Sequence, residues 1–178
     1  MRLTPCMIFL DMENKPNKII VHHTADSSQG PQFEKVNEYH KQKGFNPSTK
    51  RIYCGYHIFI EKDGQTIKAR DFSEVGQHCT EQNNTSVGIC LAGNFDEQLP
   101  TEAQKATLAE RCLEIMKMFN IPISRIYPHR MFSNTHCYGL KLSDKWAQYN
   151  VLHYELGLAR KLLLWINIEL GKLKSRPV

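Results

Sequence analysis

The spacing of apolar residues divides the chain into short runs and longer periods. Compact β-branched or alternating runs are typical of strands, whereas apolar positions three and four apart are typical of helices. The short runs predict five strands, at residues 18–22, 52–60, 66–70, 86–93 and 123–127. The longer periods predict helices at residues 32–44 and 101–119, ahead of a distinct C-terminal segment.

Turn and capping signals set the ends of these elements. Asp63 and Gly64 form a dipeptide that is typical of a tight hairpin between antiparallel strands. Gly44 is placed to stop the first helix, and Thr101 with Gln104 forms a capping box at the start of the second. Strands and helices interleave, while one strand pair must be antiparallel. We therefore expect an α/β fold with a central mixed sheet of about five strands flanked by helices.

The C-terminal segment has a period of its own. Its apolar residues step by four and three for about three heptads, at Leu152, Leu156, Ala159, Leu163, Ile166, Leu170 and Leu173. This spacing predicts a long amphipathic helix over about residues 144–171, with a break near Gly157. The stripe favours docking on the protein's own domain, because apolar faces must be buried. Self-association and binding to a membrane surface, through the basic flank and Trp165, are the alternatives.

Length and composition describe one domain with an ordinary core. The 178 residues are 41% hydrophobic and 23% charged, with a mean hydropathy of −0.46, and they contain no low-complexity stretch or internal repeat. We expect a lead-in at residues 1–17, a domain at 18–146 and a helical extension at 147–178. The net charge of +5 suits an anionic partner such as nucleic acid, a cell-wall polymer or a membrane face, but selects none of them.

The cysteines and the N-terminal segment bear on the cellular compartment. The six cysteines have no C-x-x-C spacing, so neither a zinc ribbon nor a thioredoxin motif is present. We expect most of them to be reduced, buried, small apolar residues in a protein that folds in a reducing compartment. The apolar run at residues 6–10 is too short for a signal peptide. No stretch reaches the ~18 residues of a transmembrane helix.

The loop at residues 127–139 concentrates candidate metal donors. It contains His129, His136 and Cys137 without a helical or strand period, and loops on a rigid scaffold often carry the chemistry of a protein. A catalytic zinc site needs three protein ligands and an open position. His22, at the end of the first predicted strand, is the candidate third ligand. Taken singly, a histidine at a strand end or a lone cysteine in a loop is more often structural.

Six stretches along the chain form a more specific combination. In order, they are IVHHTA at 20–25, GYHIF at 55–59 followed by Asp63-Gly64, VGQH at 75–78, NTSVGI at 84–89, GNF at 93–95, and the segment from His129-Arg130 to Thr135-His136-Cys137. Together they resemble the zinc amidases related to peptidoglycan recognition proteins, the N-acetylmuramoyl-L-alanine amidase family that includes phage amidase lysozymes. The resemblance covers about residues 18–140 and implies the fold of that family, with the C-terminal helix as an addition.

The resemblance assigns roles to individual residues. It implies Zn²⁺ held by His22, His129 and Cys137. Tyr56 matches a catalytic tyrosine that hydrogen-bonds the attacking water and the substrate carbonyl. Thr135 matches the threonine of active recognition-protein amidases, and its hydroxyl can donate to the developing oxyanion. Phage enzymes of this type tend to carry a lysine at that position.

The chain departs from the family pattern at two positions. Cytosolic wall-recycling relatives carry a catalytic glutamate where this chain has Cys90, so the general base is unassigned. The usual Cys-Pro-Gly reads Cys137-Tyr138-Gly139, which removes a proline but no metal donor. We therefore expect looser loop geometry around an intact set of ligands.

Several site residues have structural alternatives. The candidates for substrate binding are His78, Asn94, Phe95 and Arg130. His78 could contact substrate or be satisfied within its loop, and Phe95 could line the cleft or belong to the core. Arg130 could bind a stem-peptide carboxylate or orient its loop. Among the other histidines, His40 is expected in the core, His57 pointing away from the site, and His136 in solvent.

The resemblance implies a zinc hydrolase that cuts the amide bond between N-acetylmuramic acid and L-alanine in peptidoglycan. We expect a phage or prophage endolysin that is made in the cytoplasm, reaches the wall by a route without a signal peptide, and has no nucleic-acid partner. One alternative is a peptidoglycan binder without activity, although such relatives usually lack a zinc ligand. Another is an amidase with an added regulatory role, since small phage lysozymes of this type can bind the host RNA polymerase.

Overall fold

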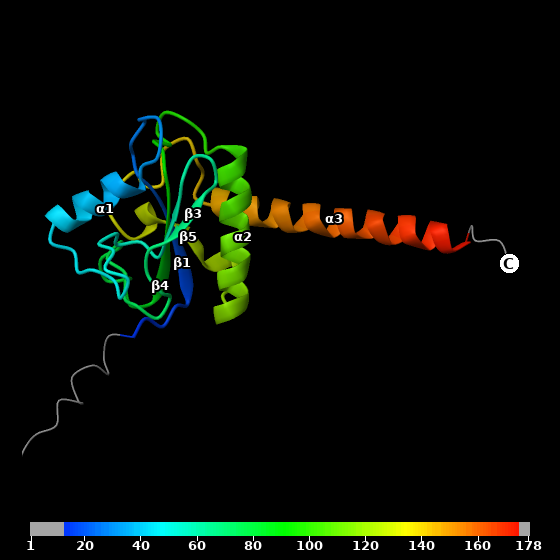
Figure 1. The fold of residues 1–178 in the computed structure, drawn as a ribbon, viewed down its shortest axis with the longest axis horizontal. Helices are drawn as coiled ribbons and strands as arrows, with labels where there is room; N and C mark the ends of the chain where they lie inside the picture. The colour runs from blue at the N-terminus through cyan, green and yellow to red at the C-terminus, as the bar shows by residue number, and fades with distance from the viewer. Residues whose placement is uncertain (1–12, 175–178) are drawn as a thin grey trace, which may run out of the picture.

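The computed structural model describes residues 13–174, with side chains up to residue 166. Within these residues, five strands, three helices and two 3-10 turns (η) follow one another (Figure 1). They are β1 (Lys18–His23), α1 (Phe33–Gln42), β2 (Ile58–Ile60), β3 (Thr66–Lys68), β4 (Ser86–Leu91), α2 (Glu102–Phe119), η1 (Ile123–Arg125), β5 (Ile126–Pro128), η2 (His129–Met131) and α3 (Trp146–Lys174). The apolar run at residues 6–10 lies outside the described residues.

The five strands form one mixed sheet in the order β3-β2-β4-β1-β5. β1 lies between β4 and β5 and is parallel to both. β2 is parallel to β4 and antiparallel to β3, and the antiparallel pair is the hairpin predicted from Asp63-Gly64. The expected α/β fold with a five-stranded mixed sheet is therefore confirmed. The central places of β1 and β4 explain why their sequences are almost continuously apolar.

The second predicted strand is shorter than expected. Residues 52–60 were expected to be extended throughout, but only Ile58–Ile60 pairs in the sheet. The backbone N–H groups of Tyr53 and Cys54 donate to Oδ1 of Asn37, at 2.8 and 3.0 Å. A side chain of α1 thus takes the donors that a strand ladder would need, which keeps this segment out of the sheet.

The last predicted strand is displaced towards the C-terminus. Residues 123–127 were expected to be a strand, but their first half is the turn η1, and β5 runs from Ile126 to Pro128. The backbone N–H of Arg125 donates to the carbonyl of Pro122 at 2.9 Å, which closes the turn. The displacement carries the end of β5 directly to His129.

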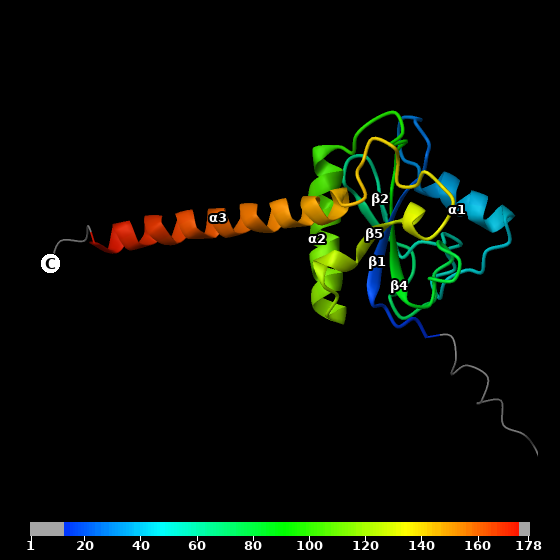
Figure 2. The ribbon, with the colours of Figure 1, turned by 180° about the vertical axis from the view of Figure 1, so that it is seen from behind.

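The sheet separates two apolar clusters, and helices cover both faces (Figures 1 and 2). The larger cluster contains Ile19 and Val21 of β1 together with residues of α2 and the first turns of α3. The smaller cluster contains Cys90 of β4 and residues of α1. Because side chains alternate along a strand, His22 projects from the face covered by α1, next to Cys90, which lies opposite it across the β1–β4 pair.

Polar side chains stabilise the starts of both domain helices. The predicted capping box of α2 is confirmed: Gln104 N–H donates to Oγ1 of Thr101 at 3.1 Å, and Thr101 N–H donates to Oε1 of Gln104 at 3.2 Å. At α1, the buried carboxylate of Glu61 accepts the N–H groups of Gln32 and Phe33. An acidic group at this position accepts hydrogen bonds from free N–H groups of the helix and interacts favourably with the positive end of the helix dipole.

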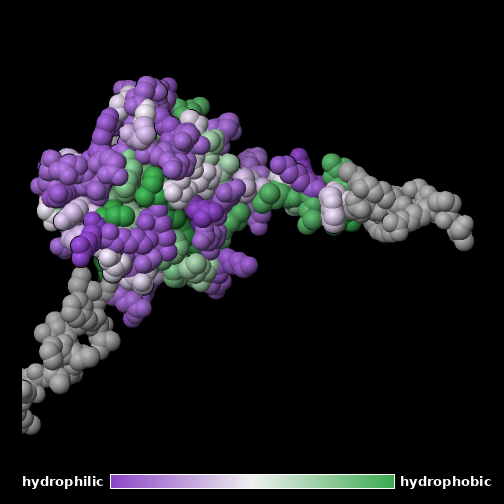
Figure 3. Space-filling model, viewed as in Figure 1, coloured by the Kyte–Doolittle hydropathy of each residue, from purple (hydrophilic) through white to green (hydrophobic). Residues whose placement is uncertain are grey.

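α3 is one continuous helix of 29 residues, so the expected break near Gly157 is wrong. Ala147 and Val151 are buried in the larger cluster and Tyr154 packs against it; beyond Tyr154 the helix leaves the domain (Figures 1 and 2). The expected docking of the apolar stripe on the domain is also wrong, since Leu156 and Leu163 are 51% and 61% exposed. α2 already covers this face of the sheet, so a straight helix crossing it runs past the domain edge. Figure 3 shows the apolar residues along the projecting part.

Two further expectations concern the state of the cysteines and the presence of membrane-spanning helices. Five cysteines are free and buried, as expected, while Cys6 lies outside the described residues. Between residues 13 and 174, no helix has both the length and the hydropathy required to cross a membrane.

Candidate metal centre

Strand pairing brings His22 and His129 together. β1 and β5 are parallel, with Val21 opposite Pro128, so His22 and His129 are the next residues along two adjacent strands. Their ring centroids lie 4.5 Å apart. His22 is 1% exposed, whereas His129 opens the turn η2 and is half-buried. The parallel register thus places two imidazoles at one edge of the sheet.

Cys137 completes a compact group of three donors. Three possible ligand atoms, one from each of His22, His129 and Cys137, lie within 4.8 Å of one another. Sγ of Cys137 is 3.7 Å from Nδ1 of His22. The backbone N–H of His23 donates to this sulfur at 3.4 Å, which favours a thiolate. Burial raises the pKa of the Cys137 thiol to about 12. A cation beside the sulfur would therefore be needed to hold the thiolate near neutral pH.

The guanidinium of Arg130 braces the loop that carries Cys137. It donates to Oδ1 of Asp144 at 2.7 Å, to the carbonyl of Gly139 at 2.7 Å and to the carbonyl of Leu142 at 2.6 Å. The backbone N–H of Arg130 donates to the carbonyl of Cys137 at 2.7 Å. Through its side chain and its backbone, Arg130 thus connects the residue after His129 to segments on both sides of Cys137.

The two residues after Cys137 fill this loop. Tyr138, where the family pattern has proline, is 1% exposed, and its hydroxyl lies 3.0 Å from the carbonyl of Ser143. Gly139 has a φ of +114°, and a Cβ there would collide with Phe95, so only glycine suits this position. A buried aromatic ring therefore holds the loop by packing, and the expected loosening is not found.

His78 lies directly behind His22. Nε2 of His22 is 3.0 Å from Nδ1 of His78, and Nε2 of His78 is 3.4 Å from Oγ of Ser86. The Ser86 hydroxyl donates to the carbonyl of Gln82 at 2.7 Å, so its oxygen can accept from Nε2–H of His78. Nδ1 of His78 then accepts from Nε2–H of His22. This chain leaves the lone pair on Nδ1 of His22, the nitrogen that faces Cys137.

A glycine makes room for the His78 ring, and burial keeps the imidazoles neutral. A Cβ on Gly88 would lie 2.5 Å from Cδ2 of His78, so the ring rests on β4 where a side chain is missing. Burial, followed by the neighbouring His78 and His129, holds the pKa of His22 well below its usual value. Burial also lowers the pKa of His129. Neutral imidazole is the form that binds metal.

Tyr56 and Cys90 flank the group on the α1 side. The ring centroids of Tyr56 and His22 are 5.0 Å apart. Burial raises the pKa of Tyr56 well above 10, so the phenol keeps its proton and can donate it in a hydrogen bond. Tyr56 packs against the smaller cluster that contains Cys90, where burial raises the pKa of the Cys90 thiol well above 9. A neutral, buried thiol is a poor proton acceptor.

Thr135 and His136 precede Cys137 in the loop. Oγ1 of Thr135 accepts the backbone N–H of Cys137 at 3.2 Å, which leaves the hydroxyl proton available for another acceptor. His136 is exposed, as expected, and lies outside the three-donor group.

The other candidates for substrate binding occupy different environments. Phe95 is fully buried in the larger cluster, and its N–H donates to Nδ1 of His23 at 3.0 Å. Asn94 is half-buried, and its Oδ1 accepts the N–H of Asp96 at 3.2 Å. The guanidinium of Arg130 is engaged by the loop. These contacts favour the core alternative for Phe95 and the loop-orienting alternative for Arg130.

Two more histidines pack inside the domain. Nδ1 of His57 accepts the N–H of Gly88 at 3.0 Å, and its Nε2 lies 2.9 Å from the carbonyl of Glu74. His40 is 8% exposed and stacks on Phe45, with centroids 4.4 Å apart. Neither belongs to the donor group, which agrees with their interpretation as packing residues.

One of two neighbouring pockets adjoins the donor group. The smaller, of about 380 Å³, has His78 and His129 in its wall. The larger, of about 900 Å³, shares Gln77 and Asn83 with it. Because two residues belong to both walls, the pockets are neighbours on one surface.

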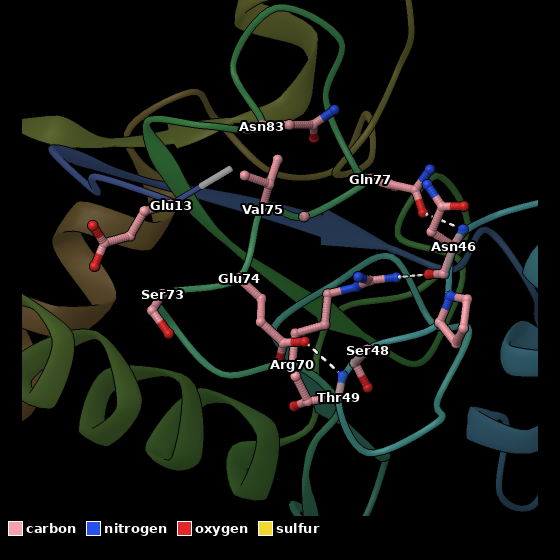
Figure 4. Close-up of a pocket in the computed structure, with 12 residues that line it drawn as sticks. Glu13, Asn46, Ser48, Thr49, Arg70, Ser73, Glu74, Val75, Gln77 and Asn83 are labelled. Atoms are coloured by element: carbon pink, nitrogen blue, oxygen red, sulfur yellow. Dashed lines mark hydrogen bonds between the residues drawn. The ribbon is translucent and has the colours of Figure 1, made fainter. Parts of the chain in front are cut away.

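The polar residues of the larger pocket are largely engaged with one another (Figure 4). Arg70 reaches from the wall to the backbone carbonyl of Asn46. Oε1 of Glu74 accepts the N–H of Thr49 at 2.7 Å. These bonds hold the segment around residues 46–49 against the domain and give the pocket a fixed polar wall.

The donor set suits zinc. It offers two imidazoles and one thiolate, all ligands that zinc accepts, and three protein ligands leave a fourth position open. Sulfur and nitrogen ligands of a tetrahedral zinc ion lie about 3.5 Å apart, close to the 3.7 Å between Sγ of Cys137 and Nδ1 of His22.

The sequence did not reveal the supporting residues Ser86 and Gly88, because only the sheet register places them beside His78.

Comparisons with known proteins agree on one family. A family model described as N-acetylmuramoyl-L-alanine amidase matches residues 12–140. The endolysin of Escherichia phage T7 is 33% identical over 81 residues, which are 45% of this chain and 50% of the relative. The amidase CwlH of Bacillus subtilis is 27% identical over 139 residues, which are 75% of this chain and 51% of the relative. The chain thus spans about half the length of these curated relatives.

Solved structures show the same architecture. The N-acetylmuramoyl-L-alanine amidase LysC from Clostridium intestinale superposes with a TM-score of 0.67 at 31% identity, covering 78% of this chain and 86% of LysC. The ectodomain complex of peptidoglycan recognition proteins LCa and LCx, bound to tracheal cytotoxin, has a TM-score of 0.64 at 24% identity, covering 73% and 81%. This second likeness concerns the fold alone.

Proposed function

Because the chain belongs to the N-acetylmuramoyl-L-alanine amidase family, we propose that it hydrolyses the amide bond between N-acetylmuramic acid and L-alanine in peptidoglycan. The observation that carries the proposal is the compact group of two buried donors, His22 and Cys137, with the half-buried His129 at the sheet edge. The similarity of the chain to phage endolysins supports a role as a phage or prophage enzyme that opens the bacterial wall.

We assign the ligand role to three side chains. Nδ1 of His22, a ring nitrogen of His129 and Sγ of Cys137 would hold Zn²⁺, with the His23 N–H supporting the sulfur. When bound, zinc supplies a Lewis acid that polarises the scissile carbonyl and makes water a stronger nucleophile near neutral pH. The bond from His22 to His78 orients the ligand ring and fixes its tautomer, as outer partners of metal-bound histidines commonly do.

Tyr56 and Thr135 would act on the substrate. The Tyr56 phenol stays protonated, so it can donate a hydrogen bond to the carbonyl oxygen as negative charge develops there. The hydroxyl of Thr135 already accepts from the Cys137 N–H, so its orientation is set and its proton can serve the same oxygen. Cys90 is a poor candidate for a general base, because burial keeps its thiol neutral.

The two neighbouring pockets offer a path for the substrate. The smaller pocket has His129 and His78 in its wall, so a group bound there would lie beside the proposed zinc ligands. The larger pocket continues past Gln77 and Asn83. We propose that the muropeptide lies along both, with its lactyl amide at the end near His129.

Mass spectrometry of digested sacculi tests this function. The protein should release stem peptides that begin with a free L-alanine amine and leave glycan strands with intact N-acetylmuramic acid carboxyl groups. Cys137→Ser should abolish release, while the matched substitution of the exposed neighbour, His136→Ala, should keep it. Cleavage within the glycan or the peptide would reject the bond assignment. Full binding to sacculi without cleavage would favour the alternative of a non-catalytic peptidoglycan binder.

A further inference from the structure

The projecting part of α3 exposes apolar side chains. Leu156, Leu163 and Ile166 are 51%, 61% and 38% exposed. Their spacing of seven and three residues places them on one face of the helix. Isolated helices are marginal in water, and their stability in proteins comes mostly from packing an apolar face. A surface of this kind on a soluble domain marks an interaction site.

The spacing of the stripe is that of a coiled coil. Apolar residues alternate steps of four and three, which places Leu156 and Leu163 at heptad position a, and Leu152, Ala159 and Ile166 at position d. This period keeps one seam facing a partner helix. By sequence, Leu170 and Leu173 continue the same period to the end of the helix.

The charges beside the stripe select a parallel partner with the same sequence. Glu155 falls at position g and Arg160 at the following position e, the two positions that meet across a parallel coiled coil. The sequence repeats this spacing at Glu169 and Lys174. In an antiparallel pair, g would face g and e would face e, which brings like charges together.

Neither charge is explained by contacts within its own helix. Glu155 and Arg160 are five residues apart, so they do not face each other as residues three or four apart do. Both side chains are exposed, and no ion pair among the described residues involves either of them. Their opposite charges are therefore available to pair with another molecule.

We propose that α3 is a self-association helix and that its partner is α3 of a second copy of this chain, packed in parallel along the Leu156–Leu163 stripe. Parallel packing places the domains of both copies at the same end of the coil, because each domain precedes its helix. Two sites linked in this way would meet a polymeric substrate at high effective concentration. The assembly itself is independent of the proposed amidase activity.

Sedimentation equilibrium and light scattering on the full chain test the assembly. At tens of micromolar we expect a mass of at least twice the chain mass of 20.6 kDa, falling towards the monomer on dilution. Leu163→Asp should give the monomer, with unchanged zinc content. The matched variant Leu164→Asp changes the neighbouring leucine, which is 62% exposed but lies off the stripe, and it should stay assembled.

Charge reversal tests the parallel register. Arg160→Glu should weaken association by facing Glu155 of the other copy, and the double variant Glu155→Lys with Arg160→Glu should restore it. A monomeric wild type, equal effects of the two leucine variants, or stronger association of Arg160→Glu would each overturn the proposal. A monomer that binds anionic vesicles and loses binding equally in both leucine variants would instead identify a membrane-surface helix.

Discussion

Nε2 of His22 lies 3.0 Å from Nδ1 of His78, and this bond turns the other nitrogen of His22 towards Cys137. The two histidines come from different parts of the fold, β1 and the connection before β4. His78 in turn rests on Gly88 and reaches Ser86. The proposed ligand is thus oriented by residues outside the group of three donors.

Replacing His78 should weaken metal binding more than it weakens the fold. His78→Ala removes the acceptor for Nε2–H of His22, and loss of such outer partners typically costs 10–100-fold in metal affinity. Zinc competition with a chromogenic chelator measures this directly. His136→Ala, which changes the exposed histidine before Cys137, should leave the affinity unchanged.

A second variant separates this effect from simple loss of packing. Gly88→Ala should displace His78, because the added Cβ would lie 2.5 Å from its ring, and it should also lower zinc affinity. Gly157→Ala meets nothing within 4 Å and should leave zinc affinity intact while stabilising α3 by up to about 1 kcal/mol. Unchanged zinc affinity in both His78→Ala and Gly88→Ala would contradict the orienting role.

Arg130 should act on the stability of the loop and not on substrate affinity. Arg130→Lys keeps the charge but loses the fork that reaches Asp144, Gly139 and Leu142, so we expect a loss of about 2 kcal/mol in the free energy of unfolding. Urea unfolding measures it, with Arg125→Lys as the matched control at a more exposed arginine. A stable variant with strongly weakened muropeptide binding would instead favour the carboxylate-binding alternative.

Acid should destabilise the fold through His57. Burial disfavours the charged ring and lowers the pKa of His57 to about 4. Protonation would also set a second N–H against the Gly88 donor. The folded state thus prefers the neutral ring, so this contribution is complete above the unfolded pKa of about 6.5 and is lost as the pH falls below it. One such group costs about 2 kcal/mol between pH 7 and pH 5.

Urea midpoints at these two pH values give the measurement. His57→Asn retains an acceptor near Nδ1 without the titration, so its pH dependence should be shallower than that of the wild type by about this amount. The exposed His136→Asn should follow the wild type. An unchanged slope in His57→Asn would show that His57 does not titrate against folding.

Local patterns predicted the fold well, and they failed where side chains compete with the backbone. The β-branched run of β1, the Asp63-Gly64 hairpin and the capping box at Thr101 depend on neighbouring residues, which the sequence displays. The segment at residues 52–57 left the sheet because the Asn37 side chain takes its donors, a contact between distant residues. The course of α3 likewise depends on where the domain surface ends.

The site divides in the same way. The grouping of His22, His129 and Cys137 was expected, and the parallel register of β1 and β5 explains it. The supports from His78, Ser86 and Gly88 could not be predicted, because they follow from the pairing of β1 with β4 and not from spacing in the chain. The ligand roles, the roles of Tyr56 and Thr135, and the division of the chain at residue 146 stay predictions.

The metal content of the purified protein tests the central claim most directly. The wild type should bind about one zinc ion per chain, and its cobalt-substituted form should show the near-ultraviolet charge-transfer band of a thiolate ligand. His22→Ala and Cys137→Ser should each lose tight binding, and Cys137→Ser should lose that band, whereas His136→Ala should keep both. Stoichiometric zinc with an unchanged cobalt spectrum in Cys137→Ser would contradict a site built from His22, His129 and Cys137.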